Sequence, residues 1–303
     1  KVSYVADKAS EDYIDHLESS IHEDLHGLRI LVDCANGAAY ATAGRLFDRF
    51  PKLMTDIINA DPDGVNINDK CGSTHMDALA AMVTAGGYDL GIAFDGDADR
   101  CLAVDEKGRE IDGDQVMALC GLSLKEQGRL FGNTVVATVM SNIGLHKFVK
   151  ENGISLECTS VGDRNVLERM LEKGYVIGGE QSGHIIFRHH ATTGDGQMSA
   201  VKLLAMAREK GVKLSRIGGM MERYPQVIIN VKADAAQKAK YAADKALAEE
   251  ISKANASLGR DGRVLVRVSG TEPLLRIMVE GREFDAINDL AVQLGETIKA
   301  AIQ

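Results

Sequence analysis

The sequence predicts an α/β protein with two consecutive mixed-sheet α/β domains, followed by a small α+β domain. Strand-like apolar runs alternate with segments of helical periodicity over most of the chain, which is typical of sheets covered by helices. The 31 glycines among 303 residues indicate many tight loops. A chain of this length has room for about two domains of roughly 150 residues, or for three smaller ones.

We expect the first domain to span residues 1–111. Apolar residues at helical spacing predict helices, and short apolar runs bounded by turn residues predict strands. The expected helices cover 11–26, 41–50 and 74–87, and the expected strands cover 27–37, 54–60, 88–94 and a pair within 101–111.

The alternation starts again near Asp112, and we expect the second domain to span 112–222 and the third 223–303. In the second domain, helices are expected over 112–128, 142–153, 164–174 and 194–211, and strands over 134–140, 155–160 and 175–180. In the third, strands are expected over 225–231, 263–268 and 274–280, and one helix each over 236–253 and 285–303.

Composition excludes several classes of function. The net charge of −9 and the lack of a Lys/Arg-rich run argue against nucleic-acid binding. No apolar run approaches the ~20 residues of a membrane span. The five cysteines include no C-x-x-C pair, which favours reduced thiols in a cytoplasmic protein over disulfides or a zinc site.

Three aspartates, Asp95, Asp97 and Asp99, alternate in a short loop between two apolar runs, and Arg100 follows them. Carboxylates this close repel one another unless a cation binds, and ligands made only of oxygen suit Mg²⁺ or Ca²⁺. A calcium loop of the EF-hand type fits less well than Mg²⁺, because Arg100 stands where that loop needs glycine and strands flank the segment. A solvated surface turn is the structural alternative.

Residues 175–187 contain Glu180, Ser182 and His184 at alternate positions between glycines. In an extended conformation these three side chains would point to one side. A carboxylate beside a hydroxyl can bind sugar hydroxyls, and a histidine can transfer a proton near neutral pH. The alternative is a turn in which the histidine is structurally satisfied.

Residues 263–281 place a polar turn between two strands, and its composition suits an anion. Arginine side chains donate charge-assisted bonds to phosphate, hydroxyls and backbone N–H groups add further donors, and glycine allows close approach. An ordinary hairpin turn is the alternative. The candidate phosphate-binding residues are Arg267, Ser269, Gly270, Thr271 and Arg276.

Two weaker candidates line the end of predicted strands. Asp33 and Asn36 follow a buried strand, and 63–75 is too long and polar for a simple connector, so we interpret both as cleft-lining or as loop structure. The pair His189-His190 is expected to be exposed. Walker A, G-x-G-x-x-G, G-x-S-x-G and H-E-x-x-H motifs are absent from the sequence.

The three loops occur in the order DGDADR, GEQSGH and RVSGTEP, and the segments VDCANGAA, NINDKCGSTH, VGDRNV and TTGDG accompany them. This set resembles the α-D-phosphohexomutase superfamily over essentially the whole chain, and most closely its phosphoglucosamine mutase branch. The resemblance implies that Asp95, Asp97 and Asp99 bind Mg²⁺ and that Arg100 lies near the transferred phosphoryl group. It implies sugar contacts for Glu180 and Ser182, and proton transfer for His184.

The resemblance further implies that Arg267, Ser269, Gly270, Thr271 and Arg276 bind the phosphate that does not react. It implies a phosphosugar substrate, a cytoplasmic location and a glucosamine 1,6-bisphosphate intermediate, and it leaves a homodimer open. The family's phosphoserine loop does not occur here, and the chain begins without methionine, so we expect a fragment that lacks the N-terminal domain and is inactive alone. The segment RHH departs from the family pattern.

Three alternatives remain. The loops of phosphoglucomutase/phosphomannomutase differ from these by only a few residues, so that enzyme is the closest rival. A module that binds Ca²⁺ or a sugar phosphate without turnover is the non-enzyme rival. A phosphatase with an aspartyl nucleophile at Asp95 fits less well, because the sequence around Asp95-x-Asp97 lacks the expected context.

Overall fold

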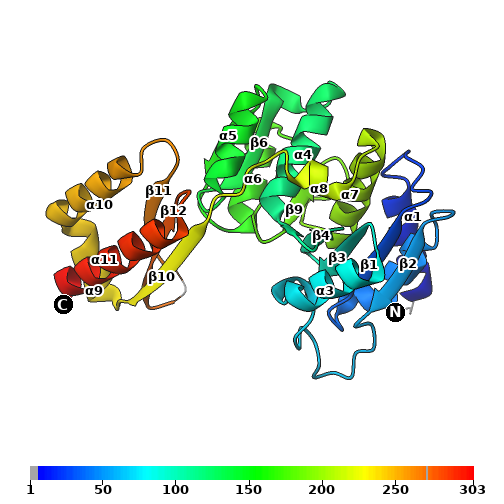
Figure 1. The fold of residues 1–303 in the computed structure, drawn as a ribbon, viewed down its shortest axis with the longest axis horizontal. Helices are drawn as coiled ribbons and strands as arrows, with labels where there is room; N and C mark the ends of the chain where they lie inside the picture. The colour runs from blue at the N-terminus through cyan, green and yellow to red at the C-terminus, as the bar shows by residue number, and fades with distance from the viewer. Residues whose placement is uncertain (1–5, 271) are drawn as a thin grey trace, which may run out of the picture. The chain divides into compact units, whose positions relative to one another are not determined.

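The computed structural model describes residues 6–270 and 272–303, which divide into two compact units (Figure 1). The first unit contains the described residues through Ser141 together with Leu145–Met221. The second contains Asn142–Gly144 and Glu222–Gln303. In the described part of the chain, we find no helix long and apolar enough to cross a membrane.

The first unit begins with a five-stranded sheet in the order β2-β1-β3-β4-β5. Strand β1 pairs in parallel with β2 and β3, and the last two strands continue the sheet in antiparallel fashion. The strands are β1 (Arg29–Asp33), β2 (Met54–Ile58), β3 (Leu90–Phe94), β4 (Cys101–Asp105) and β5 (Glu110–Ile111). The helical segments here are α1 (Ala6–Glu18), η1 (Ala38–Ala41), α2 (Ala43–Phe47), η2 (Gly72–Thr74) and α3 (Met76–Gly86).

Apolar residues cover both faces of this sheet, which is why β3 and β4 are buried along their whole length. Leu79 and Val83 of α3 pack on one face. On the other face, α1, α2 and a later helix, α7 (Gly196–Lys210), contribute to a larger core.

The second sheet of this unit has the order β7-β6-β8-β9, with the last strand antiparallel. Its strands are β6 (Thr134–Thr138), β7 (Ser155–Thr159), β8 (Ile177–Gly179) and β9 (Ile185–Phe187). The accompanying helices are α4 (Gly113–Glu126), η3 (Phe131–Asn133), α5 (Ile143–Glu151), α6 (Asp163–Lys173) and α8 (Leu214–Gly218). Because α4 packs against α7, one hydrophobic core runs continuously between the two sheets.

The second unit has its own core. Its antiparallel sheet has the order β10-β12-β11, and apolar residues such as Leu275 and Ile277 pack against the helices on one face. Its elements are β10 (Gln226–Lys232), α9 (Ala235–Ala243), α10 (Lys245–Ser257), β11 (Arg263–Val268), β12 (Leu274–Glu280) and α11 (Phe284–Ile302).

These sheets confirm the predicted fold class. The division at 111 and 222 stays a prediction. The expected helix over 11–26 is wrong in its second half, because α1 ends at Glu18. Ile21 and Leu25 lie outside the helix yet are buried in the core, so their four-residue spacing reflects burial of an irregular segment.

The expected single helix over 236–253 is two helices, α9 and α10, interrupted at Asp244. The Asp244 carboxylate accepts a hydrogen bond from the Leu247 backbone N–H at 3.0 Å, and the residue is extended, with ψ of 100°. Aspartate competes with helical hydrogen bonding in this way and caps a new helix instead. The amphipathic pattern is continuous over 236–253, so it did not predict the interruption at Asp244.

Asp33, at the end of β1, ties two loops to the sheet. Its side chain is buried and accepts hydrogen bonds from the backbone N–H groups of Ala35 at 2.8 Å and Gly72 at 2.9 Å. Ala35 has a positive φ of 55°, which costs free energy for a residue with a Cβ. These contacts support the interpretation of Asp33 as loop structure.

Replacing Asp33 with asparagine should lower the free energy of unfolding by about 2–3 kcal/mol, because one buried N–H then faces an amide NH₂. Urea unfolding of the chain would measure this. The exposed Asp48→Asn serves as the control, with an expected change below about 0.5 kcal/mol. An equal effect of the two changes would contradict the anchoring role of Asp33.

Candidate functional site

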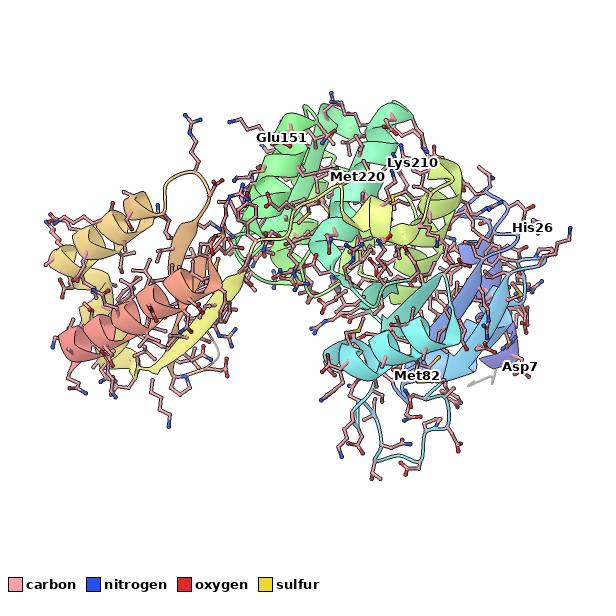
Figure 2. All side chains as sticks on the ribbon, in the orientation of Figure 1. Asp7, His26, Met82, Glu151, Lys210 and Met220 are labelled. Carbon is pink, nitrogen blue, oxygen red and sulfur yellow. The ribbon has the colours of Figure 1, made fainter. Side chains whose placement is uncertain are left out.

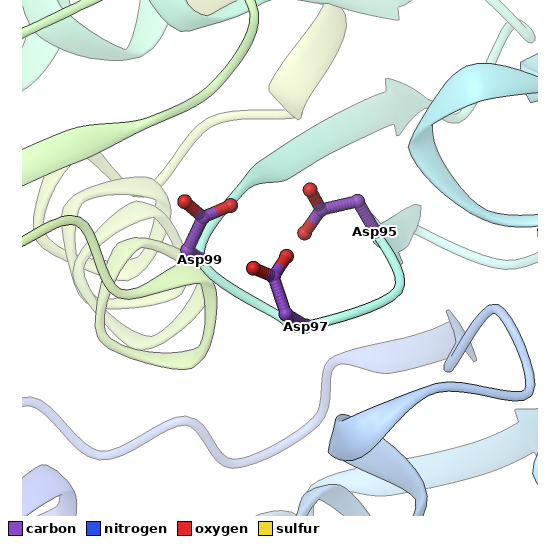
Figure 3. Close-up of side chains that lie close together, drawn as sticks. All are labelled: Asp95, Asp97 and Asp99. Atoms are coloured by element: carbon purple, nitrogen blue, oxygen red, sulfur yellow. The ribbon is translucent and has the colours of Figure 1, made fainter. Parts of the chain in front are cut away.

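The loop between β3 and β4 brings three carboxylates together (Figure 3). One oxygen from each of Asp95, Asp97 and Asp99 lies within 4.8 Å of the others. Asp95 is buried, Asp99 is half-buried and Asp97 is exposed. The structure therefore gathers the three predicted metal ligands at one point, with one side open to solvent.

The cluster is electrostatically unfavourable by itself. Burial raises the pKa of Asp95 to about 6, and the charges of Asp99 and Asp97 contribute to the rise, whereas a hydrogen bond from the Arg100 backbone N–H opposes it. The Arg100 guanidinium Nε lies 3.6 Å from Asp95 and 3.7 Å from Asp99. One exposed cation thus compensates three carboxylates only in part.

The donor set fits a hard divalent cation. Oδ1 of Asp99 is buried and has no hydrogen-bond partner among the described residues. A buried polar atom of this kind normally has a partner, and a cation can supply one. Carboxylate oxygens on a short loop are the ligands that Mg²⁺ takes together with water and substrate phosphate. The loop is therefore suited to Mg²⁺.

Backbone contacts from distant segments hold the carboxylate loop. The Ala38 N–H donates to the Gly96 carbonyl at 2.8 Å, and the Gly196 N–H donates to the Ala98 carbonyl at 2.9 Å. Ala98 has a φ of +63°, a conformation that the surrounding contacts must stabilise. The loop shape is thus imposed by its neighbours.

Two glycines make these approaches sterically feasible. A Cβ on Gly183 would overlap the Cys101 carbonyl, and a Cβ on Gly196 would overlap the Arg100 carbonyl. Gly183 also has a φ of +93°, and its own carbonyl accepts the Cys101 N–H at 3.1 Å. The carboxylate loop and the 180–184 turn are therefore joined backbone to backbone.

The 180–184 segment is a tight turn between β8 and β9, and the expected extended conformation is wrong. The Glu180 N–H donates to the His184 carbonyl at 2.9 Å, and the Gly183 N–H donates to the Glu180 carbonyl at 3.0 Å. The Glu180 carboxylate accepts the Gly162 N–H at 3.0 Å, and Ser182 is exposed. Glu180 and His184 therefore lie opposite each other where the β8–β9 register ends, and Ser182 lies in the turn between them.

His184 is 3% exposed, and its ring lies next to the carboxylate loop. Its Nε2 lies 3.5 Å from Asp99 Oδ2 and accepts the Gly194 backbone N–H at 3.2 Å. The ring thus holds the start of α7 beside the carboxylate loop.

The predicted phosphate-binding turn belongs to the second unit. Arg267 and Arg276 lie directly opposite each other on β11 and β12, so two cations share one face of the sheet. Like charges in this register are unfavourable, and an anion would relieve them. Arg276 also pairs with Glu272.

A lysine side chain of α9 holds the backbone of that turn. The Lys238 ammonium donates to the carbonyls of Ser269 at 2.8 Å and Glu272 at 2.7 Å. A Cβ on Gly270 would meet no atom of the described residues within 4 Å, and close approach of a ligand there stays a prediction. Thr271 lies outside the described residues.

Two residues that position α7, Asp195 and Tyr13, were not predicted from the sequence. Asp195 caps α7 by accepting the Met198 N–H at 2.9 Å, and it accepts the Tyr13 hydroxyl at 2.9 Å. The segment TTGDG preceding an apolar helix was the available signal for this cap.

The expected exposure of His189-His190 is correct for His189 and wrong for His190, which is half-buried.

Comparison with known proteins identifies the class. Phosphoglucomutase/phosphomannomutase family models match residues 11–108 (alpha/beta/alpha domain II), 112–224 (alpha/beta/alpha domain III) and 228–296 (C-terminal domain). Together they match nearly the whole chain. This protein therefore belongs to the phosphoglucomutase/phosphomannomutase family.

Among the relatives is the phosphoglucosamine mutase of Acetivibrio thermocellus, 50% identical over 95% of this chain and 64% of that protein. The phosphoglucosamine mutase of Clostridium acetobutylicum is 50% identical over 97% of this chain and 66% of its own length. The chain thus spans about two thirds of the length of the relatives it matches.

The fold also matches a solved structure of Aspergillus fumigatus N-acetylphosphoglucosamine mutase in complex with GlcNAc-6P and magnesium. The TM-score is 0.80 at 19% identity, covering 97% of this chain and 66% of that one. A Burkholderia thailandensis phosphoglucomutase/phosphomannomutase family protein gives a TM-score of 0.80 at 22% identity, covering 96% of this chain and 64% of that one. Both matches concern the fold alone.

Asp97→Asn should have opposite effects on stability and on metal affinity. Removing one of three crowded charges should raise the free energy of unfolding without metal by about 0.5–1 kcal/mol. It should weaken Mg²⁺ binding by about tenfold or more, because one ligand charge is lost. Urea unfolding and calorimetric titration with Mg²⁺ measure the two effects. Unchanged Mg²⁺ affinity would argue against the site.

Gly183→Ala should destabilise the chain by more than about 2 kcal/mol, through steric overlap with the Cys101 carbonyl added to backbone strain. Gly128→Ala is the matched control, since Gly128 has a φ of +68° and open space around its Cβ position. The control should cost about 1 kcal/mol from backbone strain alone. Equal losses in urea unfolding would mean that the close approach at Gly183 contributes nothing.

Proposed function

We propose that this chain is part of a phosphoglucosamine mutase, which interconverts glucosamine 6-phosphate and glucosamine 1-phosphate through an enzyme phosphoserine and a 1,6-bisphosphate. The observation that carries the proposal is the cluster of Asp95, Asp97 and Asp99 joined to the 180–184 turn. Relatives at 50% identity that bear this name support the choice of substrate.

The three aspartates would hold Mg²⁺, which supplies positive charge against the phosphoryl group during transfer. Arg100 would add a cation on the same side. Its side chain is 45% exposed and makes only long contacts with Asp95 and Asp99, so it can reorient toward a phosphoryl oxygen. The reacting serine would come from the longer protein, since its loop does not occur in this sequence.

The 180–184 turn would bind the sugar. The backbone N–H of Gly162 occupies one carboxylate oxygen of Glu180, which leaves the second oxygen and the exposed Ser182 hydroxyl for sugar hydroxyls. We propose a positioning role for His184, because its buried ring holds the Gly194 backbone close to Asp99. Proton transfer by His184 itself stays a prediction.

Arg267 and Arg276 would bind the phosphate that does not react, with the Ser269 hydroxyl and the turn around Gly270 and Thr271 completing the site. One such site serves both orientations of the bisphosphate, because each orientation presents one phosphate that is not reacting. The substrates are water-soluble sugar phosphates, and we propose that the enzyme works in the cytoplasm.

The decisive experiment is a mutase assay of the chain with and without an upstream segment that carries the phosphoserine loop. Activity should require that segment and Mg²⁺, and kcat/KM for glucosamine 1-phosphate should exceed that for the glucose and mannose esters by about tenfold or more. Preference for glucose or mannose esters would favour phosphoglucomutase/phosphomannomutase. Tight Ca²⁺ binding without any turnover would favour a binding module.

Arg267→Ala tests the distal phosphate site. Glucosamine 1-phosphate should bind about tenfold or more weakly after the change, because a charge-assisted bond to phosphate is lost. Lys253→Ala, at an exposed lysine of α10, is the control for net charge and should leave affinity unchanged. Calorimetric titration measures both. Equal affinities of the two variants would remove Arg267 from the phosphate site.

A further inference from the structure

A cavity in the first unit lies away from the carboxylate loop. It encloses about 180 Å³ and is bounded by the turn after α1, the C-terminal parts of α4 and α7, and the end of β9. Gly196, at the start of α7, contacts the carboxylate loop, whereas Lys202 and Glu209 of the same helix line the cavity. At 1.5 Å per residue, these two lie about 9–20 Å further along the helix axis.

Lys202 is the unusual residue of this cavity. It is half-buried, and its ammonium donates to the Ser20 carbonyl. In the described part of the chain, its Nζ has no carboxylate oxygen within 4.0 Å. Burial lowers the pKa of Lys202 to about 8. The charge of Glu23 acts on Lys202 from beyond ion-pair distance. An ammonium group has three N–H donors, so those that do not bond Ser20 can reach a ligand.

Charged groups of both signs lie around Lys202, since Arg129, Glu23 and Glu209 also line the cavity. Burial lowers the pKa of His190 to about 4, and the charges of Lys202, His16, Arg129 and His189 lower it further. His190 is therefore neutral at pH 7, and Lys202 and Arg129 are the lining cations that would attract an anion.

The carboxylates that line the cavity accept hydrogen bonds from neutral donors and keep their negative charges. Glu209 accepts hydrogen bonds from Ser123 and Gln127, and Glu23 accepts one from the His22 backbone N–H. The cavity also has an apolar side, formed by Ile21, Leu124, Val176, Phe187, Ala205 and Met206. The cavity therefore combines an available cation with an apolar wall.

We propose that this cavity is a second small-molecule site, which takes a compact organic anion with its acid group at Lys202 and its apolar body against the apolar wall. A space of about 150 Å³ can hold a benzene ring, so the size fits. The Ser20 hydroxyl oxygen is buried and has no hydrogen-bond partner among the described residues, so it offers a further polar contact. Pockets that bind small molecules combine apolar walls with a few polar groups in this way.

Benzoate and phenyl phosphate are the probes, and benzyl alcohol is their uncharged counterpart. In calorimetric titration of the chain at pH 7, the two anions should bind about tenfold or more tightly than benzyl alcohol. Lys202→Met should abolish this preference. Lys210→Met is the matched control on the same helix (Figure 2), because Lys210 pairs with Glu126. Asp97→Asn should leave benzoate binding intact, since it removes a carboxylate from the other site.

Equal binding of benzoate and benzyl alcohol would overturn the proposal. So would unchanged benzoate affinity in Lys202→Met, or the absence of binding by all three probes at about 10 mM. A second measurement needs no variant. Benzoate should slow acetylation of Lys202 by about threefold or more while Lys210 reacts at its former rate, as mass spectrometry of peptides would show. Equal protection of both lysines would also overturn it.

Discussion

Repulsion among Asp95, Asp97 and Asp99 is the constraint on which the rest of the first unit depends. Their oxygens lie within 4.8 Å of one another, and a free loop would separate them. The loop stays in place because hydrogen bonds from Ala38 and Gly196 fix its carbonyls, and because Gly183 accepts the N–H where β4 begins. Contacts from distant segments thus offset the electrostatic repulsion in the cluster and keep its carboxylates in place for a cation.

The helix α7 links this loop to the interior. Its first residue contacts the loop, its cap Asp195 accepts the Tyr13 hydroxyl, and its body belongs to the core between the two sheets. Preorganisation of the loop therefore rests on rigid elements and not on flexible side chains. The second unit is organised differently, because Arg267 and Arg276 face each other on a sheet with a separate core.

The sequence was sufficient for the fold class and for the aspartate cluster, since both depend on local patterns. Strand and helix periodicities are local. The alternating aspartates directly follow a predicted buried strand, so their place in a loop is also a local prediction. It was insufficient where tertiary contacts decide. The helix over 11–26 was extended too far because Ile21 and Leu25 are buried without being helical.

Tertiary contacts also explain the other differences. Glu180, Ser182 and His184 were expected in an extended segment because their alternation is local, but hydrogen bonding between strands closes a turn there and sets Glu180 opposite His184. Asp244 lies within an unbroken amphipathic pattern, so periodicity could not predict its capping hydrogen bond. Gly183 carries no side chain to suggest its close approach to Cys101.

The shared core of the first unit has a consequence for how such proteins can recombine. In sequence, the segments before and after Asp112 look like two modules that could be exchanged between homologues. Physically, the second segment supplies α7, which packs under the first sheet and takes its cap partner Tyr13 from α1. A chimera joined at Asp112 would therefore inherit mismatched halves of one interior, so these two segments must diverge together.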